Sequence, residues 1–395
     1  MKRSRIPLSL AACGALLLAA CQPAESPPTS AGAEESAAAG ESAAPSEAAA
    51  EPASVRLQLQ WTPQAQFGGY YAAEEQGYYA EENLTVEFLP GGGDIVPQQA
   101  GSAPDGPEFT IAWVPKVLQA REAGSDLVQI AQVFQRAATL AVSWKDDGIE
   151  GPEDWAGKRI GAWPFGNELE VIATATLAGL TQGEDYTRVE QDFDMSELLA
   201  AYDGCESSDT DCVDVAEAMV YNEYAQLLET ENPETGELFT PDDLNVLDYN
   251  EHGTAMLQDA LWARESWLAE EGNEDVAIRF LRASFRGWIY CRDNPDDCVQ
   301  YSLDQGSLWG QGHLAWMMNE INALIWPSPD GIGVLDQAAL EQTIETATAG
   351  EILTAEPDEG AFRSDLTEAA LEGIEEDATG EDWEKPVVEV TPGGE

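Results

Sequence analysis

Residues 57–95 read LQLQWTPQAQFGGYYAAEEQGYYAEENLTVEFLPGGGDI, and this stretch decides the fold class. At its start, residues 55–59 alternate polar and apolar side chains, which predicts a β-strand. Residues 68–81 have the spacing of a helix, and residues 84–89 predict a second strand, closed by glycines at 91–93. A strand, a helix and another strand in such short order indicate parallel pairing, and therefore an α/β layered domain.

The alternation of strand-like and helix-like segments continues beyond this stretch. A third strand, expected at 109–113, leads into a helix at 114–123. A second series begins near residue 154. The elements expected in it are a strand at 158–163, a helix at 168–179, a strand region at 213–221 and a helix at 222–230.

From about residue 250 the pattern becomes mostly helical. Apolar residues recur there at three- and four-residue steps, as in a helix packed on a core, and they are Val276, Phe280, Leu281, Phe285, Trp288 and Ile289. Two α/β series with a helical return predict two lobes, with a ligand cleft where the carboxyl ends of their strands meet. The expected boundaries are lobe I at 55–143, lobe II at 144–249, a return to lobe I at 250–350 and an acidic C-terminal region at 351–395.

Residues 1–20 have the features of a secretory signal, with Lys2, Arg3 and Arg5 before a short apolar core. The ending Leu-Ala-Ala-Cys resembles a bacterial lipobox, which implies that Cys21 is lipidated and anchors an extracytoplasmic protein to the membrane. A plain signal peptide cut elsewhere is the alternative. The segment 21–54 is almost all Ala, Glu, Ser, Pro and Gly after its cysteine, and we expect a disordered tether because it has no large apolar groups to bury.

The formal net charge of −56, from 18 basic and 74 acidic residues, excludes nucleic acid as a partner. Phosphate binding needs clustered Lys and Arg, which this chain lacks. Acidic residues are spread over the folded part as well as the tether and the tail. This composition favours a surface adapted to high salt, where charges are screened over a few ångströms; an ordinary acidic secreted protein is the alternative.

Four cysteines form two close pairs, Cys205 with Cys212 and Cys291 with Cys298. Outside the cytosol such pairs predict two local disulfides. Metal binding is the rival interpretation, but zinc sites prefer shorter cysteine spacings and histidine partners, and the chain has only two histidines. We therefore expect no metal site.

Four stretches resemble the substrate-binding proteins related to thiamine-pyrimidine synthase, a group that shares its fold with the aliphatic-sulfonate and nitrate binding proteins. They are residues 57–95, GAWPFGNELEV at 161–171, VYNEYAQ at 220–226 and ARESWL at 263–268. The likeness covers most of residues 55–345. It implies a type II periplasmic-binding fold and a monomeric solute-binding protein that serves the permease of an ABC importer. It also implies a small ligand, often a thiamine-related pyrimidine.

Aromatic side chains follow three of the predicted strands, where a cleft would lie, and they suit the stacking of a flat ring. A place in the core is the alternative for each of them, and for Tyr70 and Tyr71 the core and the cleft are equally favoured. The aromatic candidates are Trp61, Phe67, Tyr70, Tyr71, Trp113, Trp163 and Phe165.

Polar candidates cluster at two strand-to-helix junctions, and their carboxylates and amides would accept hydrogen bonds from an amino group such as that of an aminopyrimidine. A sulfonate or nitrate would instead need Arg, Lys or free N–H donors, and the nearby basic residues are Lys116, Lys158 and Arg159. Sulfonates and riboflavin-like rings stay open as alternatives. The polar candidates, with the tyrosine between them, are Gly166, Asn167, Glu168, Tyr221, Asn222 and Glu223.

Catalytic residues are not expected. In the related synthase a Lys is thought to hold pyridoxal phosphate and a His to be consumed, and the resemblance places these roles on Ala112 and Lys116, neither of which has the residue type that its role requires. The cysteine-rich iron segment of that enzyme corresponds to residues 253–263, which contain no Cys. We therefore expect a binding protein without a cofactor rather than an enzyme.

Overall fold

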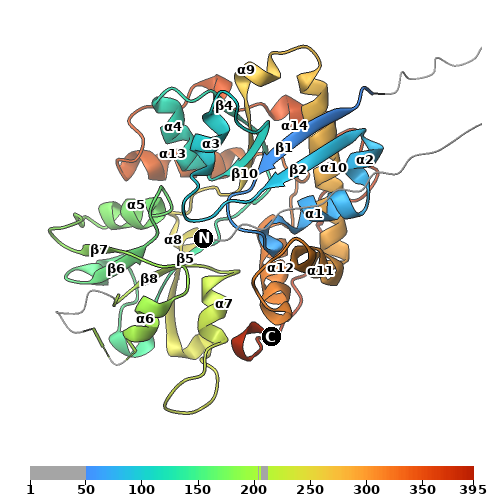
Figure 1. Cartoon of the computed structure of the whole chain (residues 1–395). Coiled ribbons are helices and arrows are strands. Elements are labelled where there is room, and N and C mark those ends of the chain that lie inside the picture. The colour runs from blue at the N-terminus through green and yellow to red at the C-terminus, as the bar shows by residue number, and fades with distance from the viewer. Residues whose placement is uncertain (1–49, 203, 206–211) are drawn as a thin grey trace, which may run out of the picture. The chain divides into compact units, whose positions relative to one another are not determined.

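The strands of the folded part form two groups (Figure 1). The computed structural model describes residues 50–202, 204–205 and 212–395. The predicted signal segment, the lipidation site Cys21 and the tether up to residue 49 lie outside these residues. Figure 1 shows β1, β2 and β10 in the upper part of the view and β5 to β8 in the lower part. We refer to these two groups, with the helices that pack on them, as the first and second lobes.

The first lobe is built on a five-stranded sheet of order β2-β1-β3-β10-β4. Strand β1 pairs in parallel with β2 and β3, as the opening stretch predicts, whereas β10 is antiparallel to both of its neighbours. The strands are β1 (Ala53–Gln58), β2 (Leu84–Leu89), β3 (Phe109–Ala112), β4 (Leu127–Gln132) and β10 (Ala260–Arg264).

Helices from both ends of the chain pack on this sheet. The helix predicted at 68–81 is two helices, because Gly77 adopts a left-handed conformation with φ of 79° and ends the first of them. Residues of the acidic C-terminal region also belong to this lobe, since α14 packs on α10 and β4. The helices are α1 (Gly68–Glu75), α2 (Tyr78–Glu81), α3 (Pro97–Ser102), α4 (Val114–Glu122), α9 (Glu265–Leu268), α10 (Asn273–Asp293), α11 (Pro295–Asp304), α12 (Gln311–Ile325), α13 (Gln337–Ala349) and α14 (Ser364–Leu371).

The second lobe has an antiparallel sheet of order β8-β5-β9 and a parallel pair, β6 with β7. The chain enters this lobe between β4 and β5 and leaves it before β10, so residues 139–143, which the sequence analysis assigns to lobe I, lie in the middle strand of the second sheet. The elements are β5 (Thr139–Trp144), β6 (Arg159–Ala162), α5 (Leu169–Leu177), β7 (Thr187–Glu190), α6 (Ser196–Ala200), β8 (Ala216–Met219), α7 (Glu223–Leu228), β9 (Leu244–Asp248) and α8 (Tyr249–His252).

The long helix α10 forms the centre of the largest core cluster. Every residue of its predicted apolar stripe is buried, which confirms the prediction. Its Trp288 lies so close to α1 that a Cβ on Gly69 would be 2.1 Å from the indole ring. Glycine at 69 therefore allows the two helices to approach and to bury the edge-on contact of Tyr70 with Trp288.

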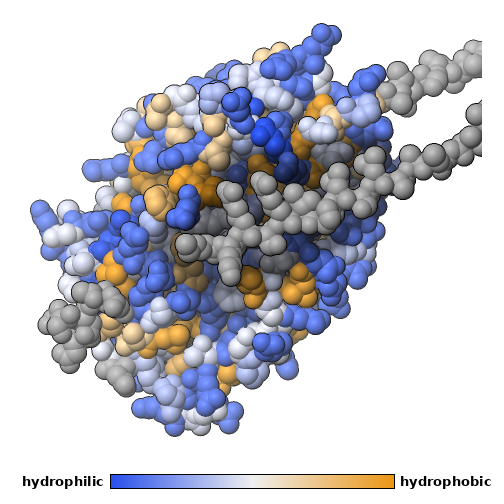
Figure 2. All heavy atoms as spheres, viewed as in Figure 1, coloured by the Kyte–Doolittle hydropathy of each residue, from blue (hydrophilic) through white to orange (hydrophobic). Residues whose placement is uncertain are grey.

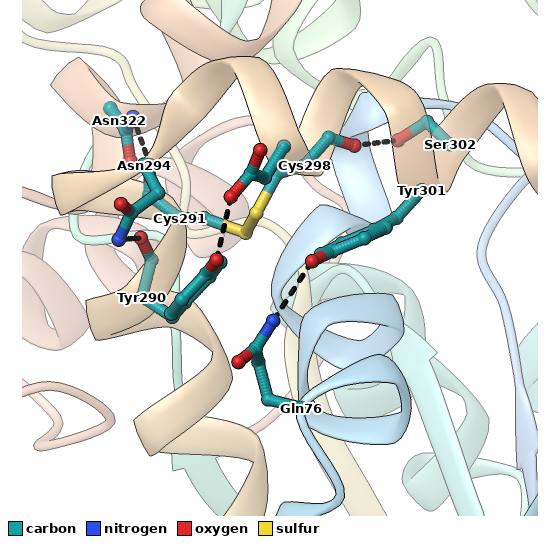
Figure 3. The surroundings of a disulfide bond; sticks show 9 residues. Gln76, Tyr290, Cys291, Asn294, Cys298, Tyr301, Ser302 and Asn322 are labelled. Atoms are coloured by element: carbon teal, nitrogen blue, oxygen red, sulfur yellow. Dashed lines mark hydrogen bonds between the residues drawn. A yellow bond between two sulfur atoms is a disulfide. The ribbon is translucent and has the colours of Figure 1, made fainter.

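Both predicted disulfides are present, Cys205–Cys212 and Cys291–Cys298. Figure 3 shows the second one joining the end of α10 to the start of α11. Around it, the Tyr290 hydroxyl donates to Asp297 at 2.6 Å, and Gln76 of the loop after α1 donates to the Tyr301 hydroxyl at 2.8 Å. The disulfide thus fixes the turn between two helices that both contact α1.

The face of the molecule in Figure 2 is mostly hydrophilic, with apolar patches of limited extent. Within the described ranges, no helix combines the length and the apolar character that crossing a membrane requires.

Candidate functional site

The candidate site is a cavity of about 370 Å³ at the carboxyl ends of strands from both lobes. Residues after β1 and β3 of the first lobe and after β6, β7 and β8 of the second contribute to its wall. This is where open α/β sheets bind ligands. We call it the aromatic cavity; its lining residues are Gln60, Trp61, Gln64, Gln66, Trp113, Trp163, Asn167, Phe193, Met219, Tyr221, Asn222 and Glu223.

Three aromatic rings form one side of the cavity. The ring of Phe193 lies nearly parallel to that of Trp163, at 13° with centroids 5.9 Å apart, and contacts Trp61 of the first lobe at 4.3 Å. The backbone of Trp163 is held by Glu217, because its N–H donates to this buried carboxylate at 2.9 Å. Its indole N–H donates to the carbonyl of Asp192 at 3.1 Å. The second-lobe rings are therefore held in place before a ligand arrives.

A chain of hydrogen bonds lines the first-lobe side. Gln64 donates to Gln66 at 2.7 Å, Gln66 donates to Asp259 at 2.6 Å, and the indole of Trp113 donates to the other carboxylate oxygen of Asp259 at 3.0 Å. Burial raises the pKa of Asp259 to about 6, although these donors lower it. Within the described residues, the Oε1 atoms of Gln60 and Gln64 are buried without a hydrogen-bond partner, so two amide oxygens of the cavity wall remain free to accept.

The junction of β8 and α7 supplies a carboxylate on the second-lobe side. Glu223 accepts from the backbone N–H of Met219 at 3.0 Å and from the side-chain amide of Asn222 at 2.7 Å. Asn222 is in turn 2.9 Å from His313 Nε2, whose Nδ1 lies 3.0 Å from Glu229. Burial raises the pKa of Glu223 to about 7, so this group both accepts hydrogen bonds and titrates near neutral pH.

Lys116 is a buried cation that interacts with Asp259, and its amine is already engaged. Its Nζ donates to the Oδ1 of Asn167 and lies 4.2 Å from the centroid of the Trp113 ring. Burial lowers the pKa of Lys116 to about 7 against the opposing effect of Asp259, Glu217 and Glu168. A buried amine shared between an amide, a ring and several carboxylates is a weak site for an anion.

Seven of the thirteen predicted site residues line the aromatic cavity: Trp61, Trp113, Trp163, Asn167, Tyr221, Asn222 and Glu223. Phe67, Tyr70 and Tyr71 lie in the core of the first lobe instead, because the start of α1 packs against α10.

The remaining three candidates, Phe165, Gly166 and Glu168, do not line the aromatic cavity. Phe165 is 59% exposed. The Glu168 carboxylate accepts from the backbone N–H of Gly166 at 2.8 Å and lies 3.9 Å from Arg188. These contacts turn the Glu168 carboxylate toward its own loop, whereas Glu223 lines the aromatic cavity.

Several residues that shape the cavity were missed by the sequence analysis. Three of them are the glutamines that follow β1, Gln60, Gln64 and Gln66. Asp259 precedes β10, a strand that the sequence did not predict, and Phe193 lies in a short loop after β7. Across the described residues there is no group of three His, Cys, Asp or Glu side chains that could hold a metal ion.

A model of the NMT1/THI5-like family matches residues 64–298, more than half of the chain. The riboflavin-binding protein RibY of Chloroflexus aurantiacus is 26% identical over 358 residues, which cover 87% of this chain and 92% of that protein. The formylaminopyrimidine-binding protein of Halalkalibacterium halodurans is 25% identical over 253 residues, 63% of this chain and 70% of that protein.

The fold is similar to that of the alkanesulfonate-binding protein SsuA from Xanthomonas axonopodis pv. citri bound to MOPS. The TM-score is 0.56 at 14% identity, and the match covers 80% of this chain and all of the other. This likeness confirms the predicted two-lobed architecture, and the family match confirms the predicted relationship. The chain thus belongs to the NMT1/THI5-like family, as a solute-binding protein with the type II periplasmic-binding fold.

Proposed function

We propose that this protein is the extracytoplasmic solute-binding component of an ABC importer and that its ligand is a small heterocycle with amino donors, first of all a thiamine-type aminopyrimidine. The observation that carries the proposal is the composition of the aromatic cavity. Trp61, Trp163 and Phe193 offer flat apolar surfaces, and the one charged residue among the described lining residues, Glu223, is a hydrogen-bond acceptor.

The polar groups favour amino donors over anions. Glu223 and the free amide oxygens of Gln60 and Gln64 accept hydrogen bonds, which suits ring-bound amino groups. Of the residues that line the aromatic cavity in the described part of the chain, none is Lys or Arg. A sulfonate would have to rely on Lys116, which already donates to Asn167. The sulfonate alternative is therefore weaker for this cavity than the aminopyrimidine.

The same geometry favours binding over catalysis. Ala112 is buried in β3 and offers no reactive group. Lys116 Nζ donates to Asn167 and lies over the Trp113 ring, so its amine is already engaged. The proposed partners are the ligand and the permease of the importer, with the binding protein acting as a monomer.

The proposed location is the outer face of the cell membrane, with Cys21 as the lipidated first residue of the mature protein. An intact-mass measurement on protein extracted from membranes tests this location. A diacylglyceryl group on Cys21 is the expected result, and an unmodified cysteine or a cleavage site elsewhere would contradict it.

Glu223→Gln should weaken the binding of formylaminopyrimidine by about ten- to a hundredfold, because a charge-assisted hydrogen bond contributes about 1.5–3 kcal/mol. Glu168→Gln removes an equal charge from a carboxylate that faces its own loop, and it should change the affinity less than about threefold. Isothermal titration calorimetry of both variants, with thermal unfolding as a check on the fold, measures the difference.

MOPS serves as the competing ligand in the same titrations. Removal of the Glu223 charge should leave the affinity for a sulfonate unchanged or improve it. If the wild-type protein binds MOPS and gives no heat with formylaminopyrimidine, the ligand assignment is wrong. A native mass spectrum of the purified protein adds an independent observation, since it shows which small molecule is carried from the cell.

A further inference from the structure

We propose that Phe193 acts as a wall that limits the ligand to a single ring and excludes a three-ring flavin. The inference rests on the proposed function and deepens it, because it concerns the size of the heterocycle. It begins with a second cavity, which we call the outer cavity, next to the aromatic cavity. Its lining residues are Gln60, Trp61, Gly92, Gly93, Ile95, Val96, Pro97, Lys116, Phe165, Asn167 and Phe193.

The two cavities have four lining residues in common: Gln60, Trp61, Asn167 and Phe193. Among these, Phe193 reaches from the second lobe to the first. Its ring contacts Trp61 at 4.3 Å, and its edge lies 3.9 Å from the position that a Cβ on Gly93 would occupy. The phenyl ring thus stands between the aromatic cavity and the glycine turn that borders the outer cavity.

The loop that carries Phe193 is fixed on both sides of the ring. The carbonyl of Asp192 accepts from the Trp163 indole at 3.1 Å, and its backbone N–H donates to Glu197 at 2.8 Å. The carbonyl of Phe193 itself accepts from the Gln226 side chain at 3.4 Å. All of these partners belong to the second lobe and hold the backbone of the loop in place, so the phenyl ring is the part of Phe193 that stands between the two spaces.

The aromatic cavity and the outer cavity are neighbouring spaces, and Phe193 lies in the wall of both. If the phenyl ring were removed, the aromatic and outer cavities would join past Trp61. A longer ligand could then extend from the ring-binding surface of Trp163 toward Phe165.

The test compares wild type with Phe193→Ala, using formylaminopyrimidine and riboflavin as probes in calorimetric titrations. We expect the variant to lose about tenfold in affinity for formylaminopyrimidine, because a ring contact is removed. We expect its affinity for riboflavin to rise by about tenfold or more. A ratio of the two affinities that does not change would overturn the proposal.

Phe362→Ala is the matched control. It removes the same side chain from a partly buried position against β4, and Phe362 lines neither of the two cavities. The control should therefore reproduce any general loss of stability while leaving the ratio of affinities at the wild-type value. A shift of the ratio in Phe362→Ala as large as that in Phe193→Ala would also count against the wall.

A crystal structure of Phe193→Ala without ligand separates this inference from the proposed function. One continuous cavity is the expected result, and it supports the wall even if wild type binds neither probe. Collapse of Trp61 or Trp163 into the vacated space, with the two cavities still separate, would overturn the role of Phe193.

Discussion

Buried carboxylates surround the aromatic cavity and the crossovers between the lobes. Glu223 lines the cavity, and Asp259 accepts from the lining residues Gln66 and Trp113. At the crossovers, Glu170 of α5 accepts from the backbone N–H of Met256 at 2.7 Å and from Gln258 at 3.0 Å. Gln258 in turn accepts from the backbone N–H of Ala138 on the other crossover at 2.8 Å. Glu170 therefore connects a second-lobe helix with both segments that join the lobes.

The stability of the protein should fall as the pH rises from about 5 to 7. Burial raises the pKa of Glu170 from 4.5 to about 7, so the folded state keeps a proton that the unfolded chain has lost. Because the folded state binds more protons in this window, its free energy of unfolding decreases with pH, by up to about 3 kcal/mol for one fully buried carboxyl. Glu223 and Asp259 contribute with the same sign.

Urea unfolding at pH 5, 6 and 7 measures this slope, and Glu170→Gln should flatten it. Glu270→Gln, at an exposed position, is the control and should leave the slope at the wild-type value. The window ends at pH 7 because Lys116 acts in the opposite direction above it: burial lowers the pKa of this amine to about 7, which adds stability as the pH rises further. A wild-type slope that Glu170→Gln does not alter would contradict the assignment.

At the scale of elements, the Cys291–Cys298 disulfide defines the corner between α10 and α11 (Figure 3). Both cysteines are fully buried, and a Cβ placed on Gly68 of α1 would lie 3.6 Å from the Cβ of Cys298 and 3.7 Å from the Sγ of Cys291. Loop closure over a sequence separation of seven contributes about 2–3 kcal/mol. The burial of the corner against α1 adds to this value.

Replacing both cysteines of this pair by alanine should lower the free energy of unfolding by more than about 3 kcal/mol. The Cys205–Cys212 disulfide closes a loop of equal length. Replacing both of its cysteines by alanine should lower the free energy of unfolding by only about 2–3 kcal/mol. Chemical denaturation of the two double variants provides the comparison. Equal losses would show that loop closure alone, and not the contact with α1, sets the effect.

Elements with a one-sided pattern were predictable from the sequence. The parallel strands β1 and β2 and the helix α10 each bury one face and expose the other, which leaves a clear period. By contrast, β4, β5 and β10 are buried along their whole length and were not predicted as strands, whereas β3 and β8, which are buried throughout as well, lie within predicted strand segments.

The candidate site could be predicted in part. Trp61 follows a predicted strand and Trp163 ends one, and both line the aromatic cavity. Asp259 precedes β10 and could not be placed before that strand was known. The direction of Glu168 depends on the backbone of Gly166 and on Arg188, which no sequence pattern reports.

At the scale of the whole molecule, negative charge dominates. With 18 basic residues against 74 acidic ones, most carboxylates have no cation to pair with. The basic residues that do form ion pairs often hold distant segments together, as Arg282 holds Glu82 and Arg363 holds Glu274. Repulsion among the remaining carboxylates opposes the compact state, and only solvent ions can relieve it.

The melting temperature at neutral pH should therefore rise as sodium chloride increases from about 0.1 M to above 1 M, where the Debye length falls from about 10 to 3 Å. A control series near the isoelectric point of about 4.1 separates charge screening from other effects of salt, because many carboxylates are protonated there. If screening is the cause, the rise should be large at pH 7 and small near pH 4. A flat or falling curve at pH 7 would contradict adaptation to high salt. Equal slopes at both pH values would assign the rise to stronger apolar burial instead of relieved repulsion.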